Sequence, residues 1–231
     1  MNKTLVTATA AFIVAALASS AGQAVALKRV VKVGEKASYQ MVIDLDFQGQ
    51  AVNVKFDTVH TVTKVNEDGS YAETEESTAQ VVTVGGQEMP GGAPNETATM
   101  TYATDGTITM IESPSATGDE YRLATLSSMI WPKAAVDVKS KWEATIKADE
   151  KKGTPEVSHK YEVLAREDLM GFMVFKISYS SQESGESSAA SAGTAWVDVK
   201  TGLTVKITGA MQHVPIMGMP MDLKFAMALR K

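Results

Sequence analysis

The segment from residue 211 to residue 221 holds the densest group of side chains that could bind a ligand. It contains four methionines, one histidine and two prolines: Met211, His213, Pro215, Met217, Met219, Pro220 and Met221. Thioether sulfurs select Cu(I), and a nearby imidazole is compatible with that ion. Methionine is also an adaptable side chain for packing on a domain or a partner. We therefore assign packing or ligand contact to Met211, Met217, Met219 and Met221 and keep Cu(I) binding as a lesser hypothesis.

The three histidines and the standard catalytic motifs offer little for catalysis. His60, His159 and His213 are far apart with no shared spacing, which is typical of surface or internally satisfied histidines. The chain contains no H-E-x-x-H, G-x-S-x-G, P-loop or G-x-G-x-x-G pattern. It has no cysteine, which excludes disulfides, thiolate catalysis and zinc-thiolate sites. The sequence predicts a protein that is not an enzyme and uses no cofactor.

Two groups of carboxylates could in principle do acid–base chemistry or bind Ca²⁺. Asp44 and Asp46 share one face of an expected strand, but their neighbours alternate cleanly with apolar residues. This pattern favours a solvated strand face. The run Glu73, Glu75 and Glu76 is interpreted in the same way, with the added effect of discouraging edge pairing.

The amino terminus predicts export. Lys3 precedes an apolar run from 5 to 17, and small residues follow, which is the pattern of a cleaved secretory signal. The run is shorter than the ~20 residues that a membrane-spanning helix needs, so we do not expect an integral membrane protein. Residues 1–26 form the expected signal peptide, with cleavage after Ala26 and with Ala21 and Ala24 as alternatives. We expect a periplasmic or extracellular protein.

Removal of that leader leaves about 205 residues, enough for one domain with a substantial core. The mature chain would carry 21 basic and 27 acidic residues. This mild acidity argues against nucleic acid or anionic lipid headgroups as main partners.

Alternation with a period of two runs through most of the mature chain. Met41, Ile43 and Leu45 alternate with polar residues, and a turn at Gly49 leads into a second alternating run, 52–57. The pair predicts a half-buried β-hairpin. The last run, from 221 to 229, has the same pattern.

Turn signals divide the rest of the chain into further strands. Asp68-Gly69 and Asp105-Gly106 are strong hairpin signals, a long strand is expected from 71 to 84, and the run 85–95 predicts a loop. The expected fold is mainly β, a single antiparallel and strongly curved sheet of about ten strands. It would form a half-barrel or two facing sheets within one domain, 27–231.

One segment departs from the β pattern. Thr117 and Glu120 form a capping box, apolar residues follow at helical spacing, and Pro132 ends the pattern. We expect one short helix over 118–129.

The chain contains a weak internal repeat. The segment 31–36, V-K-V-G-E-K, resembles 136–141, V-D-V-K-S-K, and each precedes an expected hairpin. Duplication would give two related halves, about 27–115 and 133–231. Chance repetition of short turn sequences is the alternative.

The segment 195–206 reads A-W-V-D-V-K-T-G-L-T-V-K. It resembles the W-x-D-x-x-T-G-L-x-x-K hairpin of exported envelope proteins, including LolA-like and LppX-like lipoprotein carriers and RseB-like sensors. Residues 136–142 are similar to the V-x-V-G-x-x-W element of a family of exported β proteins, with Lys139 in place of the glycine. The resemblance implies a half-open barrel with an apolar hollow partly lined by a helix. The motif specifies a turn, so it transfers no functional residue.

Three functional hypotheses follow. The leading one is a non-catalytic envelope protein that holds an apolar ligand, such as a lipid or a lipoprotein acyl chain. The alternative is a structural or interaction module that contacts an envelope protein through Met- and Pro-rich loops. A Cu(I)-binding protein is the third. Alternation identifies an apolar face but does not say whether that face is filled or open.

Overall fold

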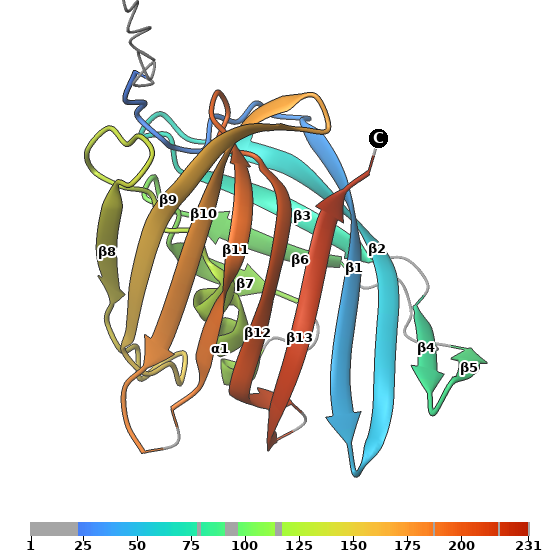
Figure 1. Ribbon diagram of the computed structural model, residues 1–231. Helices are drawn as coiled ribbons and strands as arrows, with labels where there is room; N and C mark the ends of the chain where they lie inside the picture. Colours follow the sequence, from blue (N-terminus) through green and yellow to red (C-terminus); the bar gives the residue numbers. More distant parts are fainter. Residues whose placement is uncertain are drawn as a thin grey trace, which may run out of the picture.

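The computed structural model describes residues 23–77, 80–90, 97–113, 117–186, 188–216 and 218–230. The described chain is mainly β, with one large antiparallel sheet of 13 strands and one helix (Figure 1). The elements are β1 Lys36–Phe47, β2 Gln50–Val65, β3 Tyr71–Ser77, β4 Val81–Val84, β5 Gln87–Pro90, β6 Thr97–Tyr102, β7 Ile108–Glu112, α1 Gly118–Ser127, β8 Lys141–Ile146, β9 Val157–Leu169, β10 Phe172–Glu183, β11 Ala190–Asp198, β12 Thr204–Ile216 and β13 Met219–Leu229.

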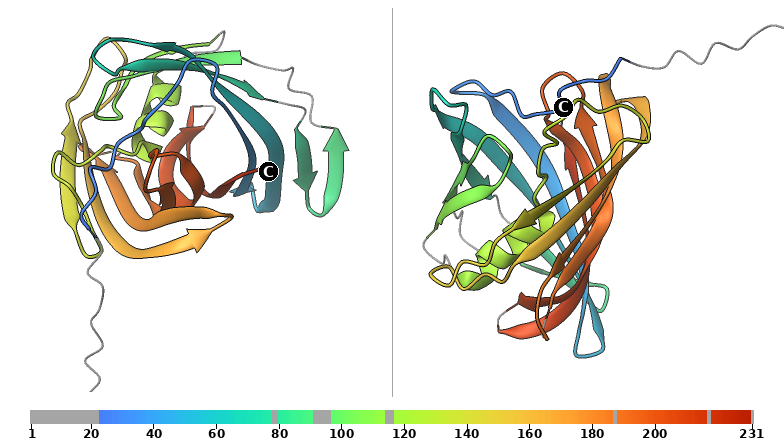
Figure 2. Two further views of the ribbon diagram at one scale, coloured as in Figure 1. Left: turned by 90° about the horizontal axis from the view of Figure 1, so that it is seen from above. Right: turned by 90° about the vertical axis from the view of Figure 1, so that its left-hand side faces the viewer.

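The main path of the sheet runs β7-β6-β3-β2-β1-β13-β12-β11-β10-β9-β8 and does not close. The sheet curls into a half-barrel, and α1 lies inside its curve (Figure 2). This helix contacts β10, β11 and β12 on one side of the concavity and β7 on the other. The predicted curved antiparallel sheet with one short helix is thus confirmed.

Two strand predictions were wrong in detail. The expected long strand from 71 to 84 is interrupted, and its second part, β4, pairs with β2 beyond the end of β3. The expected loop from 85 to 95 is a loop only in part, because Gln87–Pro90 pair with β4 as β5. Gly85 and Gly86 have positive φ and form the tight turn of that small hairpin. The rest of the expected loop, 91–95, lies outside the described residues.

The predicted alternation places apolar side chains on the concave face. In the register of β1 against β13, Met41 is opposite Met227, Ile43 is opposite Phe225 and Leu45 is opposite Leu223. All six side chains line the same internal hollow. Asp44 and Asp46 are on the other face and are exposed, as predicted.

The densest core lies between α1 and the second half of the sheet. Residues of α1 and of the segments before β1 and β8 pack there against β9 to β12. The fully buried apolar side chains of this core are Leu27, Leu126, Val157, Val163, Phe175, Ile177, Ala189, Ala195, Val197 and Val214. Helix α1 therefore covers one side of the half-barrel.

The two halves of the sheet share matching backbone geometry. Gly34 donates its N–H to the carbonyl of Val62, and Lys139 donates in the same way to Val163. Both donors have positive φ, 83° for Gly34 and 72° for Lys139. The next residue in each half accepts the N–H of the same valine. A register shift follows the valine in both halves, next to Val62 and next to Val163.

The halves also exchange equivalent contacts. The N–H of Trp131, which precedes the second half, bonds to the carbonyl of Asp105 in the β6–β7 turn. The N–H of Val30, which precedes the first half, bonds to Thr201 in the β11–β12 turn. The internal duplication predicted from 31–36 and 136–141 would account for this reciprocal arrangement and stays a prediction.

Most of the expected signal peptide, residues 1–22, lies outside the described residues. Val25 forms an antiparallel bridge with Val136, with two N···O distances of 2.8 Å. Leu27 is fully buried in the core. Val25 therefore packs with the folded domain, two residues before the predicted boundary at 27.

Candidate functional site

A hollow of about 690 Å³ lies between α1 and the first half of the sheet. Most of its lining is apolar and comes from the concave faces of β1, β2, β6, β12 and β13 and from one side of α1 and the segment that follows it. The apolar and small residues are Ala37, Met41, Ile43, Leu45, Val54, Val62, Ala98, Met100, Ile108, Ile111, Leu123, Ala124, Met129, Trp131, Ala195, Leu203, Ile207, Met211, Ile216, Leu223, Phe225 and Met227. This volume falls within the range of pockets that bind small organic ligands.

The matching halves explain why one side is filled and the other is open. In the second half, Trp142 stacks on Tyr161 with a centroid distance of 4.9 Å. Trp142 donates through Nε1 to the carbonyl of Ile130, and the Tyr161 hydroxyl donates to Ser128, so both rings hold the chain that leaves α1. The equivalent cross-strand pair in the first half is Ala37 and His60. The smaller side chains leave space there.

One end of the hollow is polar. It lies where β1 starts and β2 ends, at the top of Figure 1. Nδ1 of His60 is 3.2 Å from a Glu73 carboxylate oxygen, and Nε2 is 3.8 Å from Glu75. Arg29 pairs with Glu35 at 2.5 Å beside them. All five side chains line the hollow.

Burial and charge act in opposite directions on His60. Burial lowers the pKa of the imidazole, but the hydrogen bond to Glu73 and the charges of Glu75 and Glu73 raise it more, so the pKa lies above 6.5. The net shift shows that the carboxylates dominate the electrostatics around this ring.

Three tyrosines surround the polar end. Tyr39 meets the His60 ring edge-on at 5.1 Å, and Tyr71 stacks on Tyr102 at 4.8 Å. Burial raises the pKa of each of the three phenols, so each hydroxyl keeps its proton at neutral pH. The Tyr102 hydroxyl contacts the Met100 sulfur at 3.5 Å.

The structure places the four methionines predicted from sequence in different environments. Met211 is buried and lines the hollow. Met219 is exposed and Met221 is half-buried, and neither lines the hollow. Met217 lies outside the described residues. The interpretation of this Met- and Pro-rich segment as a loop was wrong for most of its length, because Pro215 and Pro220 are paired within the β12–β13 hairpin.

Sequence reasoning missed four methionines of the hollow: Met41, Met100, Met129 and Met227. They come from three strands and from the segment after α1, far apart in the chain. The signal that could have found the three on strands is the period-two alternation that places each on an apolar face.

The interpretation of the acidic run was wrong for two of its members. Glu73 and Glu75 point into the hollow, with side chains only 12% and 26% exposed. Glu76 is exposed, as expected. The strand β3 is also not an edge, because it pairs with both β2 and β6. Its sequence, Y-A-E-T-E-E-S, carries too little apolar contrast to show which face is inward.

His159 and His213 lie away from the hollow. His159 is fully buried, with Nδ1 2.9 Å from the Ser181 hydroxyl. Burial lowers its pKa to about 4. His213 is exposed at the β12–β13 hairpin, with φ of 53°. Neither joins His60.

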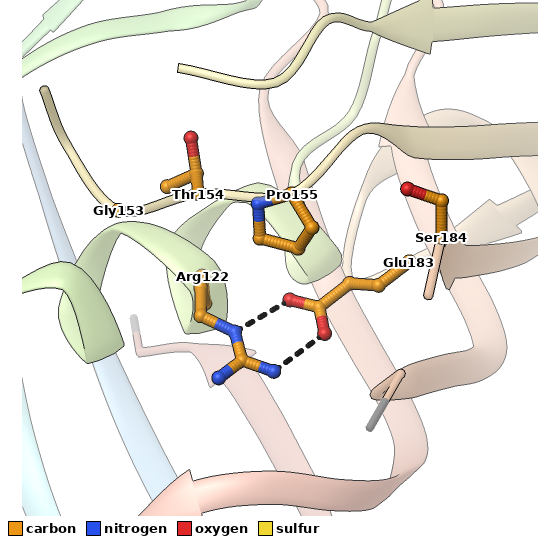
Figure 3. A pocket seen from close by; sticks show the side chains of 6 residues that line it. All are labelled: Arg122, Gly153, Thr154, Pro155, Glu183 and Ser184. Carbon is orange, nitrogen blue, oxygen red and sulfur yellow. Dashed lines mark hydrogen bonds and ion pairs between the residues drawn. The ribbon is translucent and has the colours of Figure 1, made fainter. Parts of the chain in front are cut away.

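A smaller hollow of about 340 Å³ lies at the far side of α1, lined by Arg122, Gly153, Thr154, Pro155, Glu183 and Ser184 (Figure 3). Arg122 makes a two-pronged contact with the buried Glu183 carboxylate, at 2.8 and 2.6 Å. The same carboxylate accepts the N–H of Ala189 at 2.8 Å. This ion pair fixes α1 to the end of β10, so its charged groups already have a structural role.

Within the described residues, no group of three or more His, Cys, Asp or Glu side chains is arranged to hold a metal ion. In the same part of the chain, no helix has the length and apolar character needed to cross a bilayer.

Comparison with known proteins gives a weak structural likeness. No family model matches the chain, and a search of curated proteins finds no significant relative. Among solved structures, a lipovitellin chain studied for its lipid–protein interactions superposes with a TM-score of 0.49 and 10% identity. The match covers 87% of this chain and only 25% of the lipovitellin chain. At this level of similarity, function has to be argued from the geometry of the hollow itself.

Proposed function

We propose that this protein is an exported, non-catalytic carrier that holds an apolar ligand, such as a lipid or a lipoprotein acyl chain, in the hollow of its half-barrel. The observation that carries this proposal is the volume of about 690 Å³ bounded mainly by apolar side chains. Filling an apolar hollow of this size with an apolar molecule lowers the free energy, because both apolar surfaces leave water.

Methionines support the same proposal. Five of them line the hollow: Met41, Met100, Met129, Met211 and Met227. Their flexible side chains adapt to ligands of different shape, which suits a protein that binds acyl chains of several lengths.

Export is part of the proposal. The leader-like amino terminus, with Lys3 before an apolar run and small residues after it, is the support for export. Because Val25 pairs with Val136, we place the cleavage before Val25, after Ala21 or Ala24, rather than after Ala26. Intact mass of the protein recovered from the periplasm or medium identifies the new amino terminus, and a cut after Ala26 would contradict this assignment.

The test of ligand binding has two parts. Native mass spectrometry of the purified protein should reveal a co-purified amphiphile, and the neutral fluorescent probe N-phenyl-1-naphthylamine should brighten on binding. The blocking variant is Ala124→Trp, because Ala124 lies on α1 and lines the hollow. The larger ring should abolish probe binding.

Ala134→Trp is the matched control, since Ala134 is exposed in the segment before β8. It should bind the probe as the parent protein does. Absence of both co-purified amphiphile and probe uptake in the parent protein, or equal uptake by the two variants, would overturn the proposal.

The interaction hypothesis keeps one supporting observation. Met89 and Met219, each in a Pro-containing hairpin, are 53% and 43% exposed. If these hairpins contact an envelope protein, a Met89→Ser, Met219→Ser variant should lose a partner in crosslinking while probe binding in the hollow is unchanged.

A further inference from the structure

The hollow has two chemically different ends. Where β1 ends and β13 begins, the lining is apolar: Ile43, Leu45, Val54, Ile216 and Leu223. Where β1 begins, the lining contains three carboxylates, one guanidinium and one imidazole. A ligand that fills the hollow therefore needs an apolar part and a polar end.

The polar end has an excess of negative charge. Glu35, Glu73 and Glu75 face Arg29 and His60, so the carboxylates outnumber the cations in either protonation state of the imidazole. Arg29 is already paired with Glu35. A carboxylate or phosphate brought to this end would meet two further acidic groups, Glu73 and Glu75.

Two tyrosines at this end line the hollow, and their hydroxyls are not among the buried polar atoms that lack a partner. They are Tyr39 and Tyr71, which are 4% and 7% exposed. Each hydroxyl can therefore donate to or accept from a polar group placed at this end of the hollow. Their rings, together with Tyr102, also present aromatic surface next to the carboxylates.

Aromatic rings beside carboxylates form the arrangement that recognises ammonium groups, through cation–π attraction and charge pairing. Resting on the proposed apolar-ligand function, we infer that the ligand is an amphiphile with an ammonium headgroup. Its chain lies along Ile43, Leu45 and Leu223. Its head lies between the tyrosines and Glu73 and Glu75, where a phenol oxygen can also accept an N–H if the head carries one.

The test compares headgroups on one alkyl chain. Displacement of N-phenyl-1-naphthylamine is measured with dodecylammonium, dodecyltrimethylammonium, dodecanoate and dodecanol, each below its micelle concentration. We expect both ammonium compounds to bind at least about tenfold more tightly than dodecanoate. Equal or tighter binding of dodecanoate would overturn the inference. Failure of the neutral probe itself to bind would instead reject the proposed function.

The carboxylates are tested by Glu73→Gln combined with Glu75→Gln. Ammonium binding should weaken about tenfold, while dodecanol and the neutral probe bind as before. Glu76→Gln removes an exposed charge from the same strand and is the matched control. Unchanged ammonium binding in the double variant would contradict the inference, and circular dichroism checks that the sheet is retained.

His60 adds a second readout. The charged groups that face it are Glu73, Glu75, Arg29 and Glu35, with Tyr39 against its ring. Protonation of His60 adds positive charge, so ammonium affinity should rise as pH is raised through the His60 titration. His60→Phe should remove that pH dependence. A pH profile that is flat in the parent protein or unchanged in this variant would contradict the assigned headgroup position.

Discussion

The two halves of the half-barrel share strand order, turns and register shifts, yet one is filled and the other encloses a hollow. In the second half, Trp142, Tyr161 and Tyr179 occupy consecutive cross-strand positions, and Tyr161 and Tyr179 are buried. The equivalent positions in the first half are Ala37, His60 and Glu75, which line the hollow. The backbone is therefore compatible with both outcomes, and side-chain size and polarity decide between them.

The position of α1 also contributes to the difference between the filled half and the hollow half. It packs against β10, β11 and β12, and its ion pair from Arg122 to Glu183 holds it to that side. The first half has no second helix among the described residues to cover it. Among the described residues, one helix thus serves two concave surfaces, and the surface of the first half stays open.

The largest expected effect is a difference in stability loss when one isoleucine of each half is truncated. Ile177 is fully buried in the second half, and Ile43 lines the hollow in the first. Ile177→Ala should lower the free energy of unfolding by about 3–4 kcal/mol, because it opens a cavity in a packed core. Ile43→Ala should cost less than about 1.5 kcal/mol, since space already exists beside it. Urea denaturation measures both, and equal losses would mean that the hollow is packed in solution.

The next effect concerns the attachment of the helix. Arg122→Met leaves the buried Glu183 carboxylate without its cation and should cost about 3 kcal/mol, measured by urea denaturation. Adding Glu183→Gln removes the unpaired buried charge and keeps an acceptor for the Ala189 N–H. At least half of the lost stability should therefore be recovered. No recovery in the double variant would show that side-chain packing, rather than charge, holds the helix.

The pH dependence of stability differs between the halves. The pKa of His159 falls from 6.5 to about 4 on folding, so its stabilising contribution is present above pH 6.5 and is lost as pH falls. Between pH 7.5 and 4.5 this residue should account for about 2 kcal/mol of lost stability. His60 has a raised pKa, so its contribution has the opposite sign and is lost as pH rises.

Urea denaturation of His159→Leu at both pH values checks this assignment. The variant should lose less stability than the parent protein over the same interval. His60→Phe should not reduce the acid-induced loss, and a reduction there would reverse the assignment of the two histidines.

The smallest expected effect is at the amino terminus. A chain that starts at residue 27 lacks the two hydrogen bonds between Val25 and Val136 and should be about 1 kcal/mol less stable than one that starts at residue 22. Thermal unfolding of the two chains measures the difference. Identical transitions would mean that the Val25 bridge contributes nothing to the domain.

The fold class could be predicted from sequence because it rests on local patterns. Alternation around Met41, Ile43 and Leu45 and the Asp-Gly turns identified antiparallel strands. The Thr117 to Glu120 pattern identified the start of α1, but Thr117 makes no side-chain capping hydrogen bond and the helix ends at Ser127 rather than at 129. The weak repeat between 31–36 and 136–141 also pointed to equivalent backbone elements, because a turn with positive φ constrains the sequence locally. Errors fell on 71–84 and 85–95, where partner strands decided the boundaries.

The site could be predicted only in part. Met211 was identified, but the hollow is built mainly from residues that were not singled out, and Glu73, Glu75 and His60 were interpreted as surface or satisfied residues. Their meeting depends on the register of β2 against β3, where His60 is opposite Glu75. A register between distant strands is set by the whole sheet, so no local pattern shows it.

The sequence by itself thus determined which residues form strands and that one face of the sheet is apolar. Only the tertiary structure decided that this face is filled on one side and open on the other. The physical reason is that the period of a strand assigns side chains to faces, whereas a cavity depends on the summed volume of side chains from many elements and on where α1 packs.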